Sequence, residues 1–247
     1  MAITFNEQET ARFGVRCARV IDPSVPTDVI NAEARKHAIT FLSARVSTHD
    51  TRIVHALEDD GYRLMDTLVY FERAAAASGN VSAANPNIHI RSASLRDAED
   101  VGSVAGAAFA GYFGHFHADE RLSDADCDAV YVDWATNCVV SQSLSLPVLV
   151  ACAGDSVVGF LAATRVSDTC ADIALNAVSP KMQGRGVYHA LLVAALDQIA
   201  DAGIANATIS TQINNTAVQS VWCKLGFRMQ RSLYTLHKWM DEKAERL

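Results

Sequence analysis

Hydrophobic positions recur along this chain with two different periods, and segments of the two kinds alternate. Continuous or alternating apolar runs, typical of strands, are followed by segments whose apolar residues recur every three or four positions, typical of helices. In the first third of the chain, this pattern predicts strands over residues 14–21, 40–46 and 62–71 and helices over residues 27–38 and 48–59. The expected unit is a small βαβαβ module.

A run of small and polar residues follows this module over residues 74–87 and ends in Asn-Pro-Asn. A segment of this composition, without hydrophobic periodicity, predicts a linker. We therefore expect an N-terminal α/β module over residues 1–73, the linker, and a C-terminal domain over residues 88–247. No internal sequence repeat is evident.

The C-terminal domain has its own order of predicted elements. A strand begins at residue 88, and Ser94 with Asp97 predicts a capped helix that ends near Phe109. Apolar positions at helical spacing over residues 127–138 predict a second helix with one buried face. The remaining pattern predicts strands at 148–153, 157–165, 173–178 and 207–211, helices at 186–202 and 215–225, and two final strands within 227–238. The predicted fold class is α/β (α+β) with a mixed central sheet.

Residues 178–188 join an apolar strand to an amphipathic helix and read Val-Ser-Pro-Lys-Met-Gln-Gly-Arg-Gly-Val-Tyr. Glycines at this point let an anion approach the N–H groups of the first helical turn, which have no acceptor inside the helix. The stretch lacks the Gly-Lys-Ser/Thr ending of a P-loop, and His189 stands where a dinucleotide-binding fingerprint needs its third glycine. It therefore predicts a phosphate cradle of another kind; the alternative is a strand-to-helix turn with a purely structural role.

The same stretch resembles the acyl-coenzyme A loop of the GNAT acyltransferases. The spacing Gln183-x-x-Gly186-x-Tyr188 is similar to the family pattern Arg/Gln-x-x-Gly-x-Gly/Ala, with a tyrosine in place of the last small residue. The resemblance implies a GNAT fold, acetyl-CoA or a close acyl-CoA as co-substrate, and a backbone N–H near residues 176–178 as the oxyanion donor. It also implies the residues that contact the co-substrate, namely Ala177, Val178, Gln183, Gly184, Arg185, Gly186, Val187 and Tyr188.

A second motif, at residues 215–227, is similar to the family segment Asn-x-x-Ala-x-x-x-Tyr-x-x-x-Gly-Phe. Asn215 is expected to hold the pantetheine arm or the adjacent backbone. Trp222 stands where many relatives have a tyrosine that protonates the leaving thiolate, and an indole N–H donates a hydrogen bond without surrendering its proton. We expect Trp222 to stabilise the thiolate or to fill the core, and Tyr234, Tyr188 or water to supply the proton.

Three further segments resemble the bacterial group that contains dTDP-fucosamine acetyltransferase: residues 131–137, residues 211–217, and the N-terminal module at 13–14 and 55–67. This group acylates the 4-amino group of a nucleotide-linked deoxysugar. The resemblance implies such an amino sugar as the acceptor and direct attack in a ternary complex. Two alternatives stay open: the same chemistry on an amino acid, polyamine or antibiotic, and a non-catalytic acyl-CoA-binding module.

The predicted loop between the first two helices of the C-terminal domain concentrates titratable side chains. His115 or His117 is a candidate to accept a proton from the incoming ammonium, Asp119 to orient that imidazole, and Arg121 to meet a phosphate. Asp172 is a further candidate base. The His-x-His-x-Asp spacing resembles a metal site, but no second cluster completes it, so no metal is expected. A solvated polar loop is the alternative.

Composition narrows the range of partners. The net charge of −7 and the lack of a basic cluster argue against a nucleic-acid or anionic-membrane surface. The six cysteines form no Cys-x-x-Cys pair and are expected to be reduced thiols. No leader-like or membrane-length segment is evident, which predicts a cytoplasmic protein. A homodimer is compatible with the sequence, which carries no residue that reports the oligomeric state.

Overall fold

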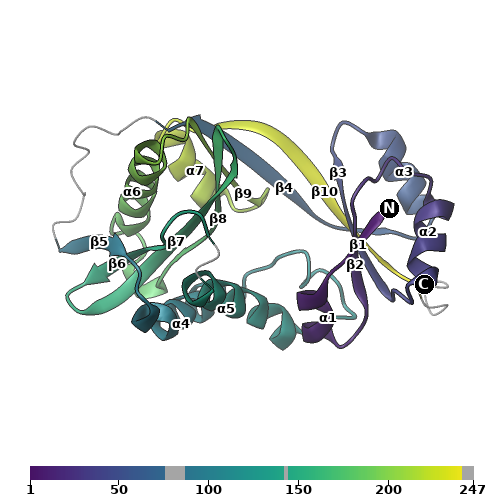
Figure 1. The fold of residues 1–247 in the computed structure, drawn as a ribbon, viewed down its shortest axis with the longest axis horizontal. Helices are drawn as coiled ribbons and strands as arrows, with labels where there is room; N and C mark the ends of the chain where they lie inside the picture. The colour runs from purple at the N-terminus through teal and green to yellow at the C-terminus, as the bar shows by residue number, and fades with distance from the viewer. Residues whose placement is uncertain (76–86, 142–143, 241–247) are drawn as a thin grey trace.

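The computed structural model describes residues 1–75, 87–141 and 144–240. Ten strands form one sheet in the order β1-β2-β3-β10-β4-β9-β8-β7-β6-β5 (Figure 1). The strands are β1 (Ile3–Phe5), β2 (Cys17–Val20), β3 (Phe41–Ser47), β4 (Arg63–Ala74), β5 (Ile88–Ser92), β6 (Leu149–Ala153), β7 (Ser156–Ser167), β8 (Cys170–Val178), β9 (Asn206–Gln212) and β10 (Arg228–Trp239). The α-helices are α1 (Glu7–Phe13), α2 (Thr27–Lys36), α3 (Thr51–Asp59), α4 (Ala98–Phe109), α5 (Asp124–Val140), α6 (Val187–Asp201) and α7 (Thr216–Lys224).

The predicted capping box at the start of the first C-terminal helix is confirmed: Ser94 and Asp97 cap a short 3-10 turn that leads into α4. The sequence pattern missed β1 and α1, which precede residue 14. Helix α1 has only seven residues, too few for a clear helical period. Its start is fixed by Asn6, whose side chain accepts the Glu9 N–H, and its end by Gly14 at φ 66°.

The last strand of the chain differs from the prediction, which was two strands within residues 227–238. A single strand, β10, runs from Arg228 to Trp239 and lies between β3 and β4, antiparallel to both. Strand β4 in turn pairs with β9, from Leu68↔Gln212 to Ala74↔Asn206. Each half of the chain thus contributes its last strand to the sheet of the other half, and the sheet is continuous across the predicted module boundary. The predicted linker lies largely outside the described residues.

This exchange gives the sheet a pseudo-two-fold topology. The order of the eight strands from β1 to β7 reads the same backwards when β1–β4 are exchanged with β7–β10. The unit β2-α2-β3-α3-β4 repeats as β8-α6-β9-α7-β10, and the pairs β2/β3 and β8/β9 are both parallel. The repeat lies in the order and pairing of the elements, and no internal sequence repeat accompanies it.

Three apolar clusters hold the elements together. One lies between the sheet and α6 and α7, the second between the opposite face and α4 and α5, and the third in the N-terminal half with α2 and α3. Successive residues of β7 serve different clusters: Phe160 faces the α4/α5 side and Leu161 the α6/α7 side. Burial on both faces explains why these strands read as nearly continuous apolar runs.

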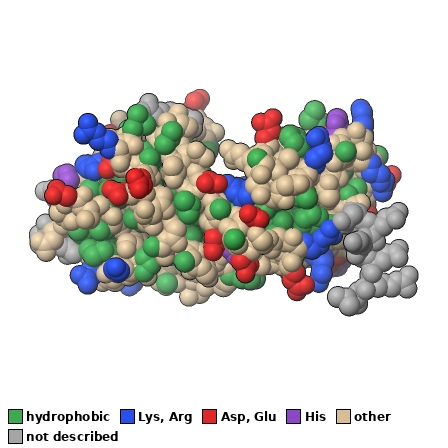
Figure 2. Space-filling view, turned by 90° about the horizontal axis from the view of Figure 1, so that it is seen from below, with side chains coloured by type: hydrophobic (Ala, Val, Ile, Leu, Met, Phe, Trp, Pro, Cys, Tyr) green, Lys and Arg blue, Asp and Glu red, His purple; other side chains and the backbone are tan. Residues whose placement is uncertain are grey.

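Helices α1 and α5 also join the two halves on the face opposite β4 and β10 (Figure 1), where Arg12 Nη2 lies 2.7 Å from Asp133 Oδ2. Seen from below, acidic side chains are scattered across the middle of the molecule and basic ones lie mainly towards its ends (Figure 2). All six cysteines are free thiols. Within the described ranges, no helix combines the length and apolar character that crossing a membrane requires.

Candidate active site

The sheet opens between its parallel strands β8 and β9. Their pairing runs from Cys170↔Asn206 to Ile173↔Ile209 and stops there, although β8 continues to Val178. Beyond that point each strand stays paired only with its outer neighbour, β8 with β7 and β9 with β4. The carboxyl ends of adjacent parallel strands are where open α/β sheets bind ligands.

A β-bulge accompanies this opening. Opposite Ala162 and Ala163 of β7, strand β8 places Leu175 and Ile173, so that Ala174 is an extra residue without a cross-strand partner. A bulge bends its strand and strengthens the local twist. The bend begins one residue after the β8–β9 pairing ends, and it accounts for the divergence of the two strands.

The loop after β8 has the geometry expected of an anion cradle. Gly184 and Gly186 both adopt left-handed backbone angles, φ 73° and φ 79°, which side-chain-bearing residues adopt at a cost. Gly186 is the N-cap of α6 and offers no side chain to cap it, so the first N–H groups of the helix keep no acceptor within it. Gln183 Nε2 lies 3.4 Å from Val178 O and closes the loop. These features suit the pyrophosphate of coenzyme A.

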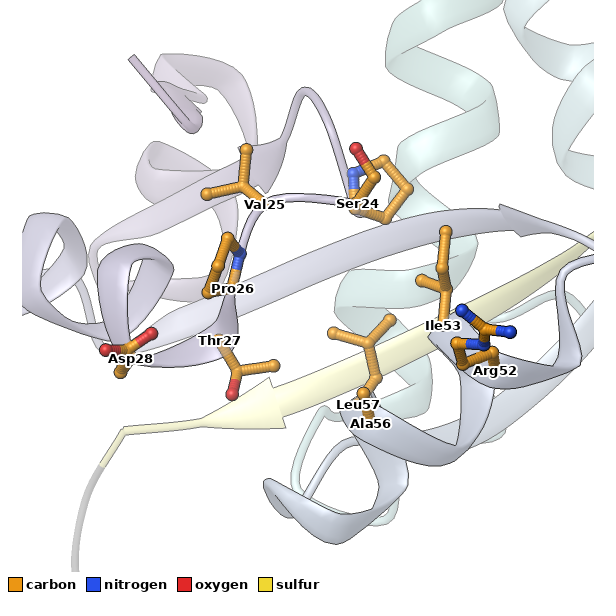
Figure 3. A pocket seen from close by; sticks show the side chains of 10 residues that line it. Ser24, Val25, Pro26, Thr27, Asp28, Arg52, Ile53, Ala56 and Leu57 are labelled. Carbon is orange, nitrogen blue, oxygen red and sulfur yellow. The ribbon is translucent and has the colours of Figure 1, made fainter.

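The topologically equivalent place in the N-terminal half is an open depression of about 450 Å³ between the loop after β2 and α3 (Figure 3). Pro23 and Pro26 occupy that loop, and proline has no N–H to donate. Asp28 adds a negative charge to the first turn of α2. The two halves therefore share a topology but not a phosphate cradle.

The turn from β9 into α7 is fixed by side-chain amides. Asn215 Nδ2 donates to Thr211 Oγ1 at 3.0 Å, and Gln219 Nε2 donates to the carbonyl oxygens of Gln212 and Ile213 at 3.2 and 2.9 Å. Asn215 thus holds the Thr211 side chain at the edge of the opening.

Trp222 and Tyr188 form a pair between α7 and α6. Trp222 is 1% exposed, its ring packs edge-on against Phe71, and its Nε1–H donates to the Tyr188 hydroxyl at 2.8 Å. Burial raises the pKa of Tyr188, which keeps its proton at neutral pH. The structure therefore places a phenol, held by the indole, beside the cradle.

A polar cluster lies at the end of β9, where the two halves meet. Gln212 Nε2 donates to Asp66 Oδ2 at 3.3 Å, and the Tyr112 hydroxyl donates to Gln212 Oε1. Asp66 Oδ1 is enclosed and has no hydrogen-bond partner. Tyr131 packs edge-on against Tyr112, with ring centroids 5.5 Å apart. We call Asp66, Gln212, Tyr112 and Tyr131 the junction cluster.

The titratable loop is organised differently from the prediction. Asp119 orients neither of its loop histidines directly: its Oδ2 lies 3.0 Å from Nδ1 of His237 on β10, and His237 Nε2 lies 2.9 Å from His115 Nδ1. His117 instead pairs through Nε2 with Asp128 of α5 at 3.2 Å. Within the described residues, no cluster of three or more metal-ligating side chains is present.

Three other candidates remain, of which Arg121 lies beside Asp119 and the other two lie apart from these groups. Arg121 stacks on the Trp239 ring, 4.0 Å from its centroid. Asp172 accepts a hydrogen bond from Thr208 Oγ1 at 3.0 Å where β8 and β9 are still paired, and burial raises its pKa. Tyr234 packs against the N-terminal core, whereas Tyr188 and Trp222 belong to the cluster around α6 and α7.

Residues 110–227, which contain the opening, the cradle and both motifs, match the model of the acetyltransferase (GNAT) family. The match covers just under half of the chain. The predicted family and fold class are confirmed. Strand β4 lies outside the matched residues but pairs with β9, which lies within them.

The chain is also similar to a curated protein. The spore coat polysaccharide biosynthesis protein SpsD of Bacillus subtilis is 24% identical over 130 residues, which cover 53% of this chain and 44% of SpsD. The chain thus spans less than half the length of that relative.

Solved structures share the fold over both halves. A tandem GNAT protein from the clavulanic acid biosynthesis pathway is 14% identical, with a TM-score of 0.66, over 93% of this chain and 77% of its own. A GCN5-related N-acetyltransferase from Sphaerobacter thermophilus is 12% identical, with a TM-score of 0.63, over 96% and 76%. At these identities the likeness concerns the fold alone.

Sequence reasoning singled out neither Tyr112 nor His237 as a functional residue. The only signal for His237 is its alternation with Trp239, which places both side chains on one face of β10. Which loop would reach that face depends on the tertiary structure.

Proposed function

We propose that this protein is an N-acetyltransferase that transfers the acetyl group of acetyl-CoA to an amine. The observation that carries the proposal is the coincidence, within the family-matched region, of the strand opening between β8 and β9 with the glycine cradle at the start of α6. The cradle binds the pyrophosphate through backbone amides and the helix dipole. The opening admits the pantetheine arm between the two strands.

The residues around the opening supply the remaining chemistry. The backbone of β8 at residues 176–178 offers N–H donors to the oxyanion that develops on the acyl carbon. Tyr188 protonates the leaving thiolate, and the Trp222 N–H stabilises the phenolate oxygen that remains. The tryptophan in the family's tyrosine position is thus compensated by a phenol from the neighbouring helix.

The acceptor we propose is the amine of a nucleotide-linked amino deoxysugar. The three segments that resemble the amino-sugar acetyltransferases each contribute to the junction cluster: Asp66 from the N-terminal module, Tyr131 from α5 and Gln212 from β9. A sugar presents hydroxyl donors that suit the unpartnered Asp66 Oδ1, and ring faces that suit tyrosines. The similarity to SpsD supports a saccharide-related acceptor. A cytoplasmic location follows as part of this proposal.

The test is a mass-spectrometric assay of the full chain with acetyl-CoA and a panel of amines, with thiol release followed in parallel. The panel contains nucleotide-linked 4-amino and 3-amino deoxysugars, polyamines and amino acids. Gain of one acetyl group by a sugar nucleotide supports the proposal, and acetylation of only another amine refutes the acceptor class. Coenzyme A binding without any product would refute the enzyme and favour a binding module.

Matched variants separate the acceptor site from the cradle. Asp66→Asn is expected to raise the KM for the sugar roughly tenfold or more, because it removes a charged hydrogen-bond acceptor. Coenzyme A affinity is expected to stay unchanged. Asp59→Asn, an exposed carboxylate at the end of α3, is the control and should change neither quantity. Equal KM values for Asp66→Asn and the wild type would exclude Asp66 from acceptor binding.

A further inference from the structure

Three ionisable side chains form a hydrogen-bonded chain where the two halves of the molecule meet. Asp119 Oδ2 lies 3.0 Å from His237 Nδ1, and His237 Nε2 lies 2.9 Å from His115 Nδ1. Asp119 and His237 are 5% and 1% exposed. Burying a carboxylate and two imidazoles is costly unless each is paired, so the arrangement calls for a specific role.

The hydrogen-bonded series Asp119–His237–His115 is held firmly at the Asp119 end. Trp239 Nε1–H donates to both oxygens of Asp119, at 3.2 and 3.0 Å, and the Arg121 N–H donates to its Oδ1 at 3.2 Å. The Phe41 ring of β3 packs edge-on against His237, with centroids 4.7 Å apart. Trp239 of β10, the loop backbone at Arg121 and Phe41 of β3 thus hold Asp119 and His237 in place.

With Asp119 ionised and His237 neutral, the hydrogen bonds determine which ring nitrogens carry protons. An ionised Asp119 only accepts, so His237 Nδ1 must carry a proton and donate it. In neutral His237, Nε2 is then an acceptor, so His115 must carry its own proton on Nδ1. The remaining nitrogen of His115, Nε2, is left with a free lone pair, as in the relay that prepares a histidine base for catalysis.

The surroundings keep this lone pair available at neutral pH. Burial is the main cause that holds the pKa of His115 well below its ordinary value, followed by repulsion from His237 in its charged form and from Arg45 on β3 and Arg19 on β2. His117 adds to this effect from the same loop. Burial alone would raise the pKa of Asp119, but the hydrogen bonds from His237 and Trp239 outweigh it and lower that pKa.

His115 also lies next to the junction cluster along the chain. A Cβ built on the preceding residue, Gly114, would lie 2.6 Å from the Tyr131 hydroxyl and 3.8 Å from Gln212 Nε2. Within the described part of the chain, His115 Nε2 makes no hydrogen bond and is not among the fully enclosed unpartnered atoms. The free nitrogen therefore belongs to a residue at the edge of the proposed acceptor site.

We propose that His115 is the base that deprotonates the acceptor ammonium, with His237 and Asp119 as positioning residues. The inference rests on the proposed function. One ammonium proton passes to His115 Nε2 and then to solvent. The amine nitrogen bonds to the acyl carbon as the carbon–sulfur bond breaks and Tyr188 protonates the thiolate. The second nitrogen proton passes to solvent, from which the Tyr188 phenolate regains its proton. His117 is unsuited to this role because its Nε2 pairs with Asp128 and its Nδ1 is enclosed.

The test is the pH profile of kcat/KM for the acceptor in the full chain, for His115→Gln, His237→Gln and the double variant. His115→Gln is expected to lose ~10²-fold or more at neutral pH and much less at high pH, where the amine is already unprotonated. His237→Gln is expected to lose about tenfold. In the His115→Gln background, His237→Gln should have no further effect, because its role acts through His115.

Controls separate folding from chemistry. Thermal unfolding and coenzyme A affinity are measured for each variant, and His89→Gln, an exposed histidine on β5, is the matched control. If His237→Gln does not fold, Asp119→Asn takes its place in the cycle. Additive losses in the double variant would overturn the positioning role, and a neutral-pH loss confined to His117→Gln would overturn the choice of base.

A measurement independent of turnover uses the wild-type protein. Long-range ¹⁵N–¹H spectra of the histidine rings report which nitrogen carries the proton, and we expect the Nδ1–H tautomer for His115. The Nε2–H tautomer would overturn the inference. Wild-type protein that acetylates no amine would refute the proposed function, whereas an active enzyme whose His115→Gln variant keeps the wild-type pH profile would refute this inference alone.

Discussion

Replacing Trp222 and Tyr188 by phenylalanine, singly and together, tests the pair that links α6 and α7. Trp222→Phe removes a buried hydrogen-bond donor, which contributes about 1 kcal/mol, and about 40 Å² of buried apolar surface, worth about 1 kcal/mol more. The free energy of unfolding should fall by about 2 kcal/mol. For a chain of this size, the melting temperature should fall by about 4–8 °C.

Tyr188→Phe leaves the Trp222 N–H buried without an acceptor and should also destabilise, by about 1–3 kcal/mol. The double variant loses the same hydrogen bond only once, so its loss should be smaller than the sum by about 1 kcal/mol. The assay is chemical unfolding of all four proteins. Trp134→Phe, a tryptophan that is 42% exposed, is the control and should change stability little.

Turnover distinguishes the two residues further. We expect Tyr188→Phe to lower kcat about tenfold or more, because it removes the proposed acid, while coenzyme A still binds. Stability losses that add within about 0.5 kcal/mol would show that the two side chains do not interact. An unchanged kcat in Tyr188→Phe would show that the thiolate needs no proton from this phenol.

Two further predictions concern backbone strain and an ion pair. Gly186→Val should sharply weaken coenzyme A binding measured by calorimetry, because a β-branched residue is strained at φ 79°. The control Gly154→Val, at φ 59° in the β6–β7 turn, should lower stability but leave coenzyme A affinity unchanged. Equal affinities of the two variants would reject the cradle. Asp97 accepts hydrogen bonds from Arg91 and Ser94, which hold its pKa well below the ordinary 3.8. The ionised Asp97 carboxylate therefore stabilises the fold fully at pH values above 3.8. This stabilisation is lost as the pH falls from 3.8 through the lowered pKa of the folded protein. Asp97→Asn should destabilise by about 1–3 kcal/mol at pH 7, with the difference from wild type shrinking in acid unfolding titrations below pH ~4. A difference independent of pH would contradict this reasoning.

Local signals predicted the segments of this fold well where they were long and periodic. The helix over residues 27–38 is α2, the capping box at Ser94 leads into α4, and the glycines after β8 open α6. These features depend on neighbours within a few residues, which the sequence displays directly. The seven-residue helix α1 was missed because it is shorter than two helical turns.

The candidate site was predicted less completely, since its chemistry is divided among distant segments. The glycine loop and Asn215 lie where the motifs indicated, and Trp222 proved to be buried. The partner of Asp119 was not predictable, because His237 follows it by 118 residues and reaches it only through the placement of β10.

The sequence by itself determined the resemblance to the family, the alternation of strands and helices, and the glycine turn before α6, because each is encoded by local spacing and backbone preference. Only the tertiary structure decided that β4 and β10 are exchanged between the halves, and that Asp66 meets Gln212 and His237 meets His115. Strand pairing is chosen by the free energy of burying both faces of the whole sheet, a sum over residues far apart in the chain. A short sequence motif therefore does not determine which strands pair.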